Sequence, residues 1–164
     1  MGESKATKVS AKTVFNNPVH VLAFGFGSGL APKAPGTAGT LMAIPLYLLM
    51  TALSLPIYIA VCFAVSLVGI YICGRSAQLL NTHDHPGIVW DEFAGFFITM
   101  IGFAVTWQNV LFGFVLFRIF DILKPWPIKW IDKKVDGGLG IMLDDILAGI
   151  FAWFCLYGVN LFWL

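Results

Sequence analysis

The sequence predicts an all-α fold, a small polytopic membrane bundle of about five long apolar helices with the polar loops gathered on one face. Hydrophobic residues make up 59% of the 164 residues and charged residues only 12%, whereas about a quarter of a soluble domain is charged. Long stretches of the chain carry no charge at all, as membrane-spanning helices require. The net charge of +1 gives no bulk attraction to nucleic acid, and a nucleic-acid-binding module is excluded.

The first uncharged stretch lies between Lys33 and Arg75 and is interrupted at Leu55-Pro56. A span needs ~20 apolar residues, so this stretch is too long for one crossing. It predicts two helices, at about 39–54 and 57–75.

The second uncharged stretch lies between Glu92 and Arg118 and is interrupted by polar residues near Trp107. Asp91 lies 16 residues before Trp107, and Asp121 lies 14 residues after it. At ~1.5 Å per residue, a helical hairpin that turns at Trp107 returns Asp121 to the level of Asp91. The alternative is one 25-residue crossing, which would separate the two acids on opposite faces.

The last helix is predicted at about 144–164 and begins with Asp144-Asp145. With five spans, every charged residue lies on one side of the membrane, and the positive-inside rule makes that side cytoplasmic. The chain is therefore expected to be a multi-pass membrane protein with the polar site on the cytoplasmic face. A soluble bundle of the same helices is the alternative.

Two regions are expected along the chain. Residues 1–15 form a flexible basic tail with three lysines, and residues 16–164 form a single helical membrane-embedded domain.

A glycine-rich segment at 25–40 is the first candidate for chemistry. Glycines let backbone N–H groups approach an anion, and a helix amino terminus attracts phosphate. Gly36, Thr37 and Lys33 are therefore candidate phosphate contacts, and Thr37 or Thr40 is expected to cap the following helix.

The second candidate segment runs from His83 to Phe93. Asp91 and Glu92 stand at the start of an apolar helix, where one carboxylate has to face the bundle and needs a partner or a metal. His83 and Asp84 are candidates to protonate a leaving alkoxide or to position water.

The third segment begins with Arg118, Asp121 and Lys124, which the i, i+3, i+6 spacing places along one helix face. Several carboxylates gathered on one face suit Mg²⁺, which takes oxygen ligands. Arg and Lys beside Mg²⁺ stabilise a phosphoryl transition state. The predicted metal ligands are Asp91, Glu92, Asp121, Asp144 and Asp145, and Arg118 and Lys124 are the predicted phosphate-binding cations.

These segments together resemble the phosphatidylglycerophosphatase A family. The matching words are Gly25-Phe26-Gly27-Ser28-Gly29-Leu30, Pro35-Gly36-Thr37, Val89-Trp90-Asp91-Glu92-Phe93, Arg118-Ile119-Phe120-Asp121, Lys124-Pro125-Trp126-Pro127, Gly137-Gly138-Leu139-Gly140-Ile141-Met142 and Asp144-Asp145. The resemblance implies an inner-membrane, Mg²⁺-dependent phosphatase that converts phosphatidylglycerophosphate to phosphatidylglycerol and phosphate.

On this hypothesis the residues expected to carry the reaction are Asp91, Asp121, Arg118, Lys124, His83 and Asp84. The expected partners are the phospholipid substrate and membrane lipids, with no nucleic acid and no obligate protein partner. Two alternatives are a transporter or channel with an acidic ion site, and a phospholipid headgroup transferase. The transferase motif is absent, because no Ala-Arg follows Asp136-Gly137.

Overall fold

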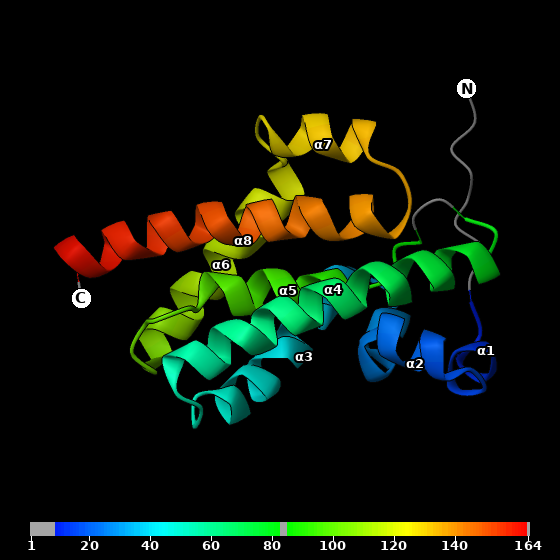
Figure 1. The fold of residues 1–164 in the computed structure, drawn as a ribbon, viewed down its shortest axis with the longest axis horizontal. Coiled ribbons are helices and arrows are strands. Elements are labelled where there is room, and N and C mark those ends of the chain that lie inside the picture. Colours follow the sequence, from blue (N-terminus) through cyan, green and yellow to red (C-terminus); the bar gives the residue numbers. More distant parts are fainter. Residues whose placement is uncertain (1–8, 83–84, 164) are drawn as a thin grey trace.

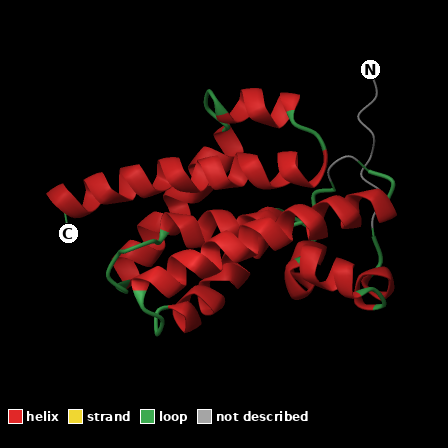
Figure 2. Ribbon diagram, in the orientation of Figure 1, coloured by secondary structure: helices red, strands yellow, loops and turns green. Residues whose placement is uncertain are grey.

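The computed structural model describes residues 9–82 and 85–163, and all regular structure in this part is helical (Figure 2). The all-α prediction is confirmed. In chain order the elements are α1 (Ala11–Phe15), α2 (Pro18–Ala23), the 3₁₀ helix η1 (Gly25–Leu30), α3 (Pro35–Met50), α4 (Leu55–Leu79), α5 (Trp90–Thr99), α6 (Trp107–Leu123), α7 (Ile128–Lys134) and α8 (Gly137–Phe162).

The two longest helices, α4 and α8, lie side by side along the length of the molecule (Figure 1). Glycines allow their close approach, since a Cβ on Gly138 would lie 1.9 Å from the carbonyl oxygen of Ile70. Gly138 also faces Gly74 at this crossing. These glycines serve helix packing rather than a loop.

Helix α8 consequently begins at Gly137, earlier than the predicted start at 144. The prediction that Asp144 and Asp145 open the last helix is wrong. They lie about two turns inside α8, where both side chains are buried.

Helix α5 occupies the centre of the bundle and packs against α3, α4, α6 and α8. Nearly all of its side chains are buried, including Phe93, Phe96 and Phe97. Its ten residues are fewer than predicted, because the chain turns immediately afterwards and Gly102 adopts a positive φ of 79°. Glu92 nevertheless contacts Arg118 of α6, which confirms the hairpin and overturns the single 25-residue crossing.

Within the described residues, α4 and α8 are the two helices long and apolar enough to cross a membrane, judged by length and composition alone. Helix α3 is apolar but has only 16 residues, and α5 is too short to cross a ~30 Å hydrocarbon core. These two apolar helices are consistent with membrane association, and the predicted count of five spans is not confirmed.

The amino-terminal helices pack on one end of α4 and on η1. Ser10 caps α1 by accepting from the Thr13 amide, and Val14 is fully buried. Residues 11–15, assigned by the sequence to a flexible tail, are thus helical. His20 of α2 is bonded through Nδ1 to Ser76 Oγ of α4 at 2.8 Å, which fixes α2 against the long helix.

Candidate active site

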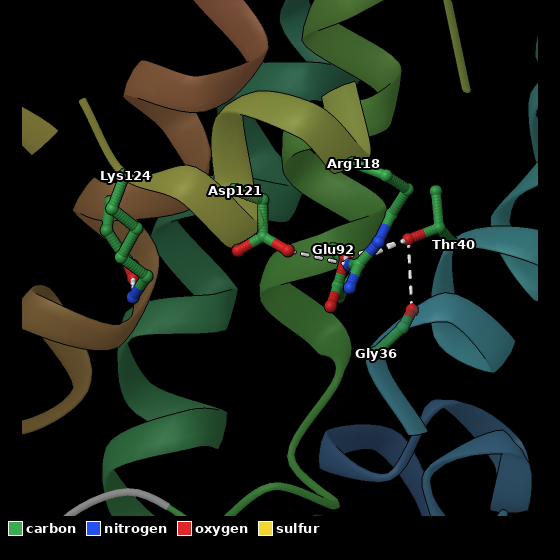
Figure 3. A network of polar contacts seen from close by, with 7 residues as sticks. Gly36, Thr40, Glu92, Arg118, Asp121 and Lys124 are labelled. Carbon is green, nitrogen blue, oxygen red and sulfur yellow. Dashed lines mark hydrogen bonds and ion pairs between the residues drawn. The ribbon is translucent and has the colours of Figure 1, made fainter. Parts of the chain in front are cut away.

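Glu92 lies at the centre of a buried polar cluster formed by α3, α5 and α6 (Figure 3). Its carboxylate accepts a 2.7 Å hydrogen bond from the Thr40 hydroxyl of α3 and forms an ion pair with Arg118 of α6. Burial raises the pKa of Glu92 to about 7, and the charge of Asp121 adds to the rise, although Arg118 and Thr40 oppose it.

Arg118 joins the three helices electrostatically. Its guanidinium lies 2.8 Å from Asp121 Oδ2, one turn further along α6, and 3.4 Å from the Thr40 hydroxyl. Because Arg118 and Asp121 are separated by three residues, a helix places them on the same face, as the sequence predicts. A planar guanidinium in this position can also grip two oxygens of a phosphate.

Gly36 brings the amino terminus of α3 directly against this ion pair. A Cβ at Gly36 would lie 2.1 Å from Glu92 Oε1 and 3.2 Å from both terminal nitrogens of Arg118. Any larger residue here would push the ends of the Glu92 and Arg118 side chains out of their present positions. The first-turn N–H groups of α3 therefore lie beside Arg118, and such groups bind anions.

Lys124 forms a second polar centre at the end of α6. Its ammonium pairs with Asp144 of α8 and lies 2.8 Å from Asp132 of α7. Burial lowers the pKa of Lys124, but the charges and hydrogen bonds of Asp144 and Asp132 raise it by more than burial lowers it. The net shift of the Lys124 pKa is therefore upward. Lys124 thus stays charged beside the carboxylates.

Asp145 is the most deeply placed acid of the cluster. Its side chain is 2% exposed, and Oδ2 has no hydrogen-bond partner among the described residues. It interacts electrostatically with four other carboxylates, those of Asp121, Glu92, Asp91 and Asp144. The five acids predicted as metal ligands therefore gather around one region.

The donor chemistry of this region fits Mg²⁺. Asp144 Oδ1 and Asp145 Oδ2 are buried oxygens without hydrogen-bond partners in the described part of the chain, and hard oxygen donors are what Mg²⁺ takes. As arranged, however, residues 9–82 and 85–163 contain no group of three or more His, Cys, Asp or Glu able to hold a metal ion. Oxygens of Glu92, Asp121 and Asp144 contact Arg118 or Lys124 instead.

The remaining predicted site residues lie at the start of α3, in the loop before it and near residue 83. Thr37 is half-buried in the first turn of α3, and Lys33 is exposed in the loop before it. His83 and Asp84 lie outside the described residues. The capping prediction for Thr37 or Thr40 is wrong, because α3 begins at Pro35 and its N-cap is Ala34.

Two functional contacts were not predicted, those of Thr40 with Glu92 and of Asp132 with Lys124. The spacing of Gly36 and Thr40, one helical turn apart, is the signal that could have found the first. The contact of Asp132 with Lys124 depends on how α7 packs after the end of α6, and the sequence pattern does not indicate this packing.

The candidate site of this all-helical protein thus combines buried carboxylates with an arginine, a lysine and a helix amino terminus, groups that together can bind phosphate. Comparison with known proteins identifies the family. A family model described as Phosphatidylglycerophosphatase A matches residues 21–160, and the chain belongs to this family of phosphatases.

Three curated relatives are similar over most of their length. Phosphatidylglycerophosphatase A of Escherichia coli (strain K12) is 49% identical over 149 residues, which is 90% of this chain and 87% of the relative. The protein of the same name from Haemophilus influenzae is 44% identical over 153 residues, covering 90% and 91% of the two chains. A Bacteroides thetaiotaomicron protein is 37% identical over 137 residues, covering 78% and 84%, and is named provisionally as a phosphatidylinositol-3-phosphatase. No solved structure matches the chain.

Proposed function

We propose that the protein hydrolyses phosphatidylglycerophosphate to phosphatidylglycerol and phosphate, with Mg²⁺, at the cytoplasmic face of a bacterial inner membrane. The observation that carries the proposal is the buried Thr40–Glu92–Arg118–Asp121 cluster against the amino terminus of α3. Similarity at 49% identity to a named phosphatidylglycerophosphatase A supports the choice of substrate.

Phosphate binding falls to Arg118, Lys124 and the first turn of α3. Arg118 presents two terminal nitrogens on the side of Gly36, so it and the α3 amides can hold oxygens of one monoester together. Lys124, at the carboxyl-terminal end of α6, adds a positive point charge.

The carboxylates would hold Mg²⁺, namely Asp91, Glu92, Asp121, Asp144 and Asp145. Bound there, the ion supplies positive charge against the phosphate oxygens and lowers the pKa of water. Thr40 fixes the Glu92 carboxylate through its hydroxyl. Water adds to phosphorus, the P–O bond to the glycerol breaks, and the departing alkoxide takes a proton from a carboxyl group or from the His83–Asp84 pair.

Phosphate release by the purified protein in mild detergent tests the proposal. Phosphatidylglycerophosphate and phosphatidylinositol 3-phosphate are assayed in parallel, each with Mg²⁺ and then with EDTA. We expect release from phosphatidylglycerophosphate that EDTA abolishes. Faster release from the inositol lipid would move the substrate assignment towards the Bacteroides relative.

Asp121→Asn is the site variant, and Asp136→Asn is its matched control, since Asp136 is exposed and lies outside the cluster. We expect Asp121→Asn to lose activity at least a hundredfold and Asp136→Asn to keep it. Full activity in Asp121→Asn would refute the role given to this carboxylate.

A further inference from the structure

An apolar groove of about 490 Å³ lies between α3 and α6, the two helices that contribute Thr40 and Arg118 to the candidate site. Leu41, Ile44 and Leu48 line it from α3, and Trp107, Leu111 and Phe114 line it from α6. Large side chains remain open to the surroundings, with Leu48 46% and Trp107 72% exposed. A groove of this size is within the range of small-molecule and cofactor sites.

The register of the two helices joins the groove to the phosphate site. On α3, positions 37, 41, 44 and 48 form one stripe at helical spacing, so the apolar wall ends in Thr37. On α6, positions 107, 111, 114 and 118 form the facing stripe, which ends in Arg118. The helices run antiparallel, and both stripes become polar at the same end of the groove.

The length of the groove matches a lipid tail. Thr37 and Leu48 are eleven residues apart, and a helix rises ~1.5 Å per residue, so the stripe extends ~16 Å from the polar end. One leaflet of a ~30 Å hydrocarbon core has about that depth. A molecule with its phosphate at Arg118 and an apolar tail along α3 and α6 fills both parts at once.

We propose that this groove binds an acyl chain of the phospholipid substrate and so sets the preference for long-chain over short-chain lipids. The inference rests on the proposed function. Continuity with the phosphate site selects the occupant, because a second copy of the chain would gain nothing from the polar end at Thr37 and Arg118. A phosphomonoester lipid carries more negative charge to Arg118 than the phosphodiester of a bulk lipid does.

The first experiment fills the groove without touching the site. Leu48→Trp and Leu111→Trp add bulk to opposite walls at half-exposed positions, 46% and 48% exposed, where folding tolerates the change. Leu67→Trp is the matched control, since Leu67 is 52% exposed on α4 and does not line the groove. Each protein is assayed on dioleoyl and dihexanoyl phosphatidylglycerophosphate in mixed micelles.

We expect both groove variants to lose at least tenfold in kcat/KM for the dioleoyl substrate, equivalent to about 1.4 kcal/mol, and to keep the dihexanoyl value within twofold. Leu67→Trp should match the unmodified protein on both lipids. If the ratio of kcat/KM for the dioleoyl substrate to kcat/KM for the dihexanoyl substrate were the same in all four proteins, the groove inference would be overturned and the proposed function would stand. Lack of hydrolysis by the unmodified protein would instead refute the proposed function.

The second experiment reads occupancy without turnover. A phosphatidylglycerophosphate carrying a diazirine near the end of one acyl chain is bound to the protein and irradiated, and the labelled peptides are identified by mass spectrometry. We expect labels on peptides containing Leu48 or Trp107, and their loss in Leu48→Trp. The same labels from a diazirine phosphatidylcholine would show that any membrane lipid enters, which overturns the inference.

Discussion

Replacing Gly36 by alanine tests the core of the candidate site with one methyl group. The added Cβ would lie 2.1 Å from Glu92 Oε1, whereas ordinary van der Waals contact begins at 3.4 Å. The carboxylate therefore has to move by about 1.3 Å, the difference between these distances. Thr40 donates its 2.7 Å hydrogen bond to the other carboxylate oxygen, Oε2, and a shift of the whole carboxylate away from α3 would lengthen this bond beyond hydrogen-bonding distance.

These contacts set the expected loss of stability and of activity. Losing a hydrogen bond to a charged group costs about 1.5–3 kcal/mol in stability. A displacement of 1 Å at a catalytic centre can reduce the rate about a hundredfold. We expect Gly36→Ala to reduce kcat/KM for phosphatidylglycerophosphate about a hundredfold and to lower the unfolding temperature in detergent.

Gly158→Ala provides the control with the same chemical change. Gly158 lies in α8, and a Cβ there meets nothing within 4 Å. Alanine should stabilise the helix by up to about 1 kcal/mol and leave hydrolysis unchanged. Wild-type activity and stability in Gly36→Ala would show that Glu92 and Arg118 are not held in place by the start of α3.

Two further substitutions separate binding from folding. Arg118→Lys keeps the charge but removes the planar guanidinium, so kcat/KM should fall at least tenfold in phosphate-release assays, while Arg75→Lys at an exposed position should retain activity. Asp145→Asn replaces a carboxyl group whose ionisation is disfavoured by burial and by the neighbouring carboxylates, so in EDTA the unfolding temperature should rise by ~2–4 °C, corresponding to ~1 kcal/mol for a chain of this size. Activity with Mg²⁺ should be lost in the same variant, and a lower unfolding temperature with intact turnover would contradict this account.

Charge placement predicted which helices bring their polar side chains together. The uncharged stretches and the position of Trp107 predicted a hairpin that returns Asp121 to Asp91, and the Glu92–Arg118 pair confirms it. This worked because helix length converts residue counts into distances along one axis.

Features that depend on packing could not be predicted in the same way. Glycines near residues 137–140 look like a loop in the sequence, yet Gly138 lies in α8 because Gly74 of α4 packs against it. Thr40 looked like a cap, and its contact with Glu92 depends on how α3 and α5 pack together. Both errors arise because a small or polar residue has the same local preference in a loop as in a tight helix crossing.

The balance of charge in the site gives a reason to expect Mg²⁺ before substrate. Five carboxylates face only two cations, Arg118 and Lys124, in the buried region. In their ionised forms these carboxylates would repel a phosphate monoester dianion, and a divalent cation would remove the repulsion. On the proposed function, a metal held by the carboxylate oxygens would leave Arg118 and Lys124 free to bind phosphate. Arg118 and Lys124 pair with these acids in the structure. If they hold the substrate as proposed, loss of Mg²⁺ should weaken phosphate binding as well as catalysis.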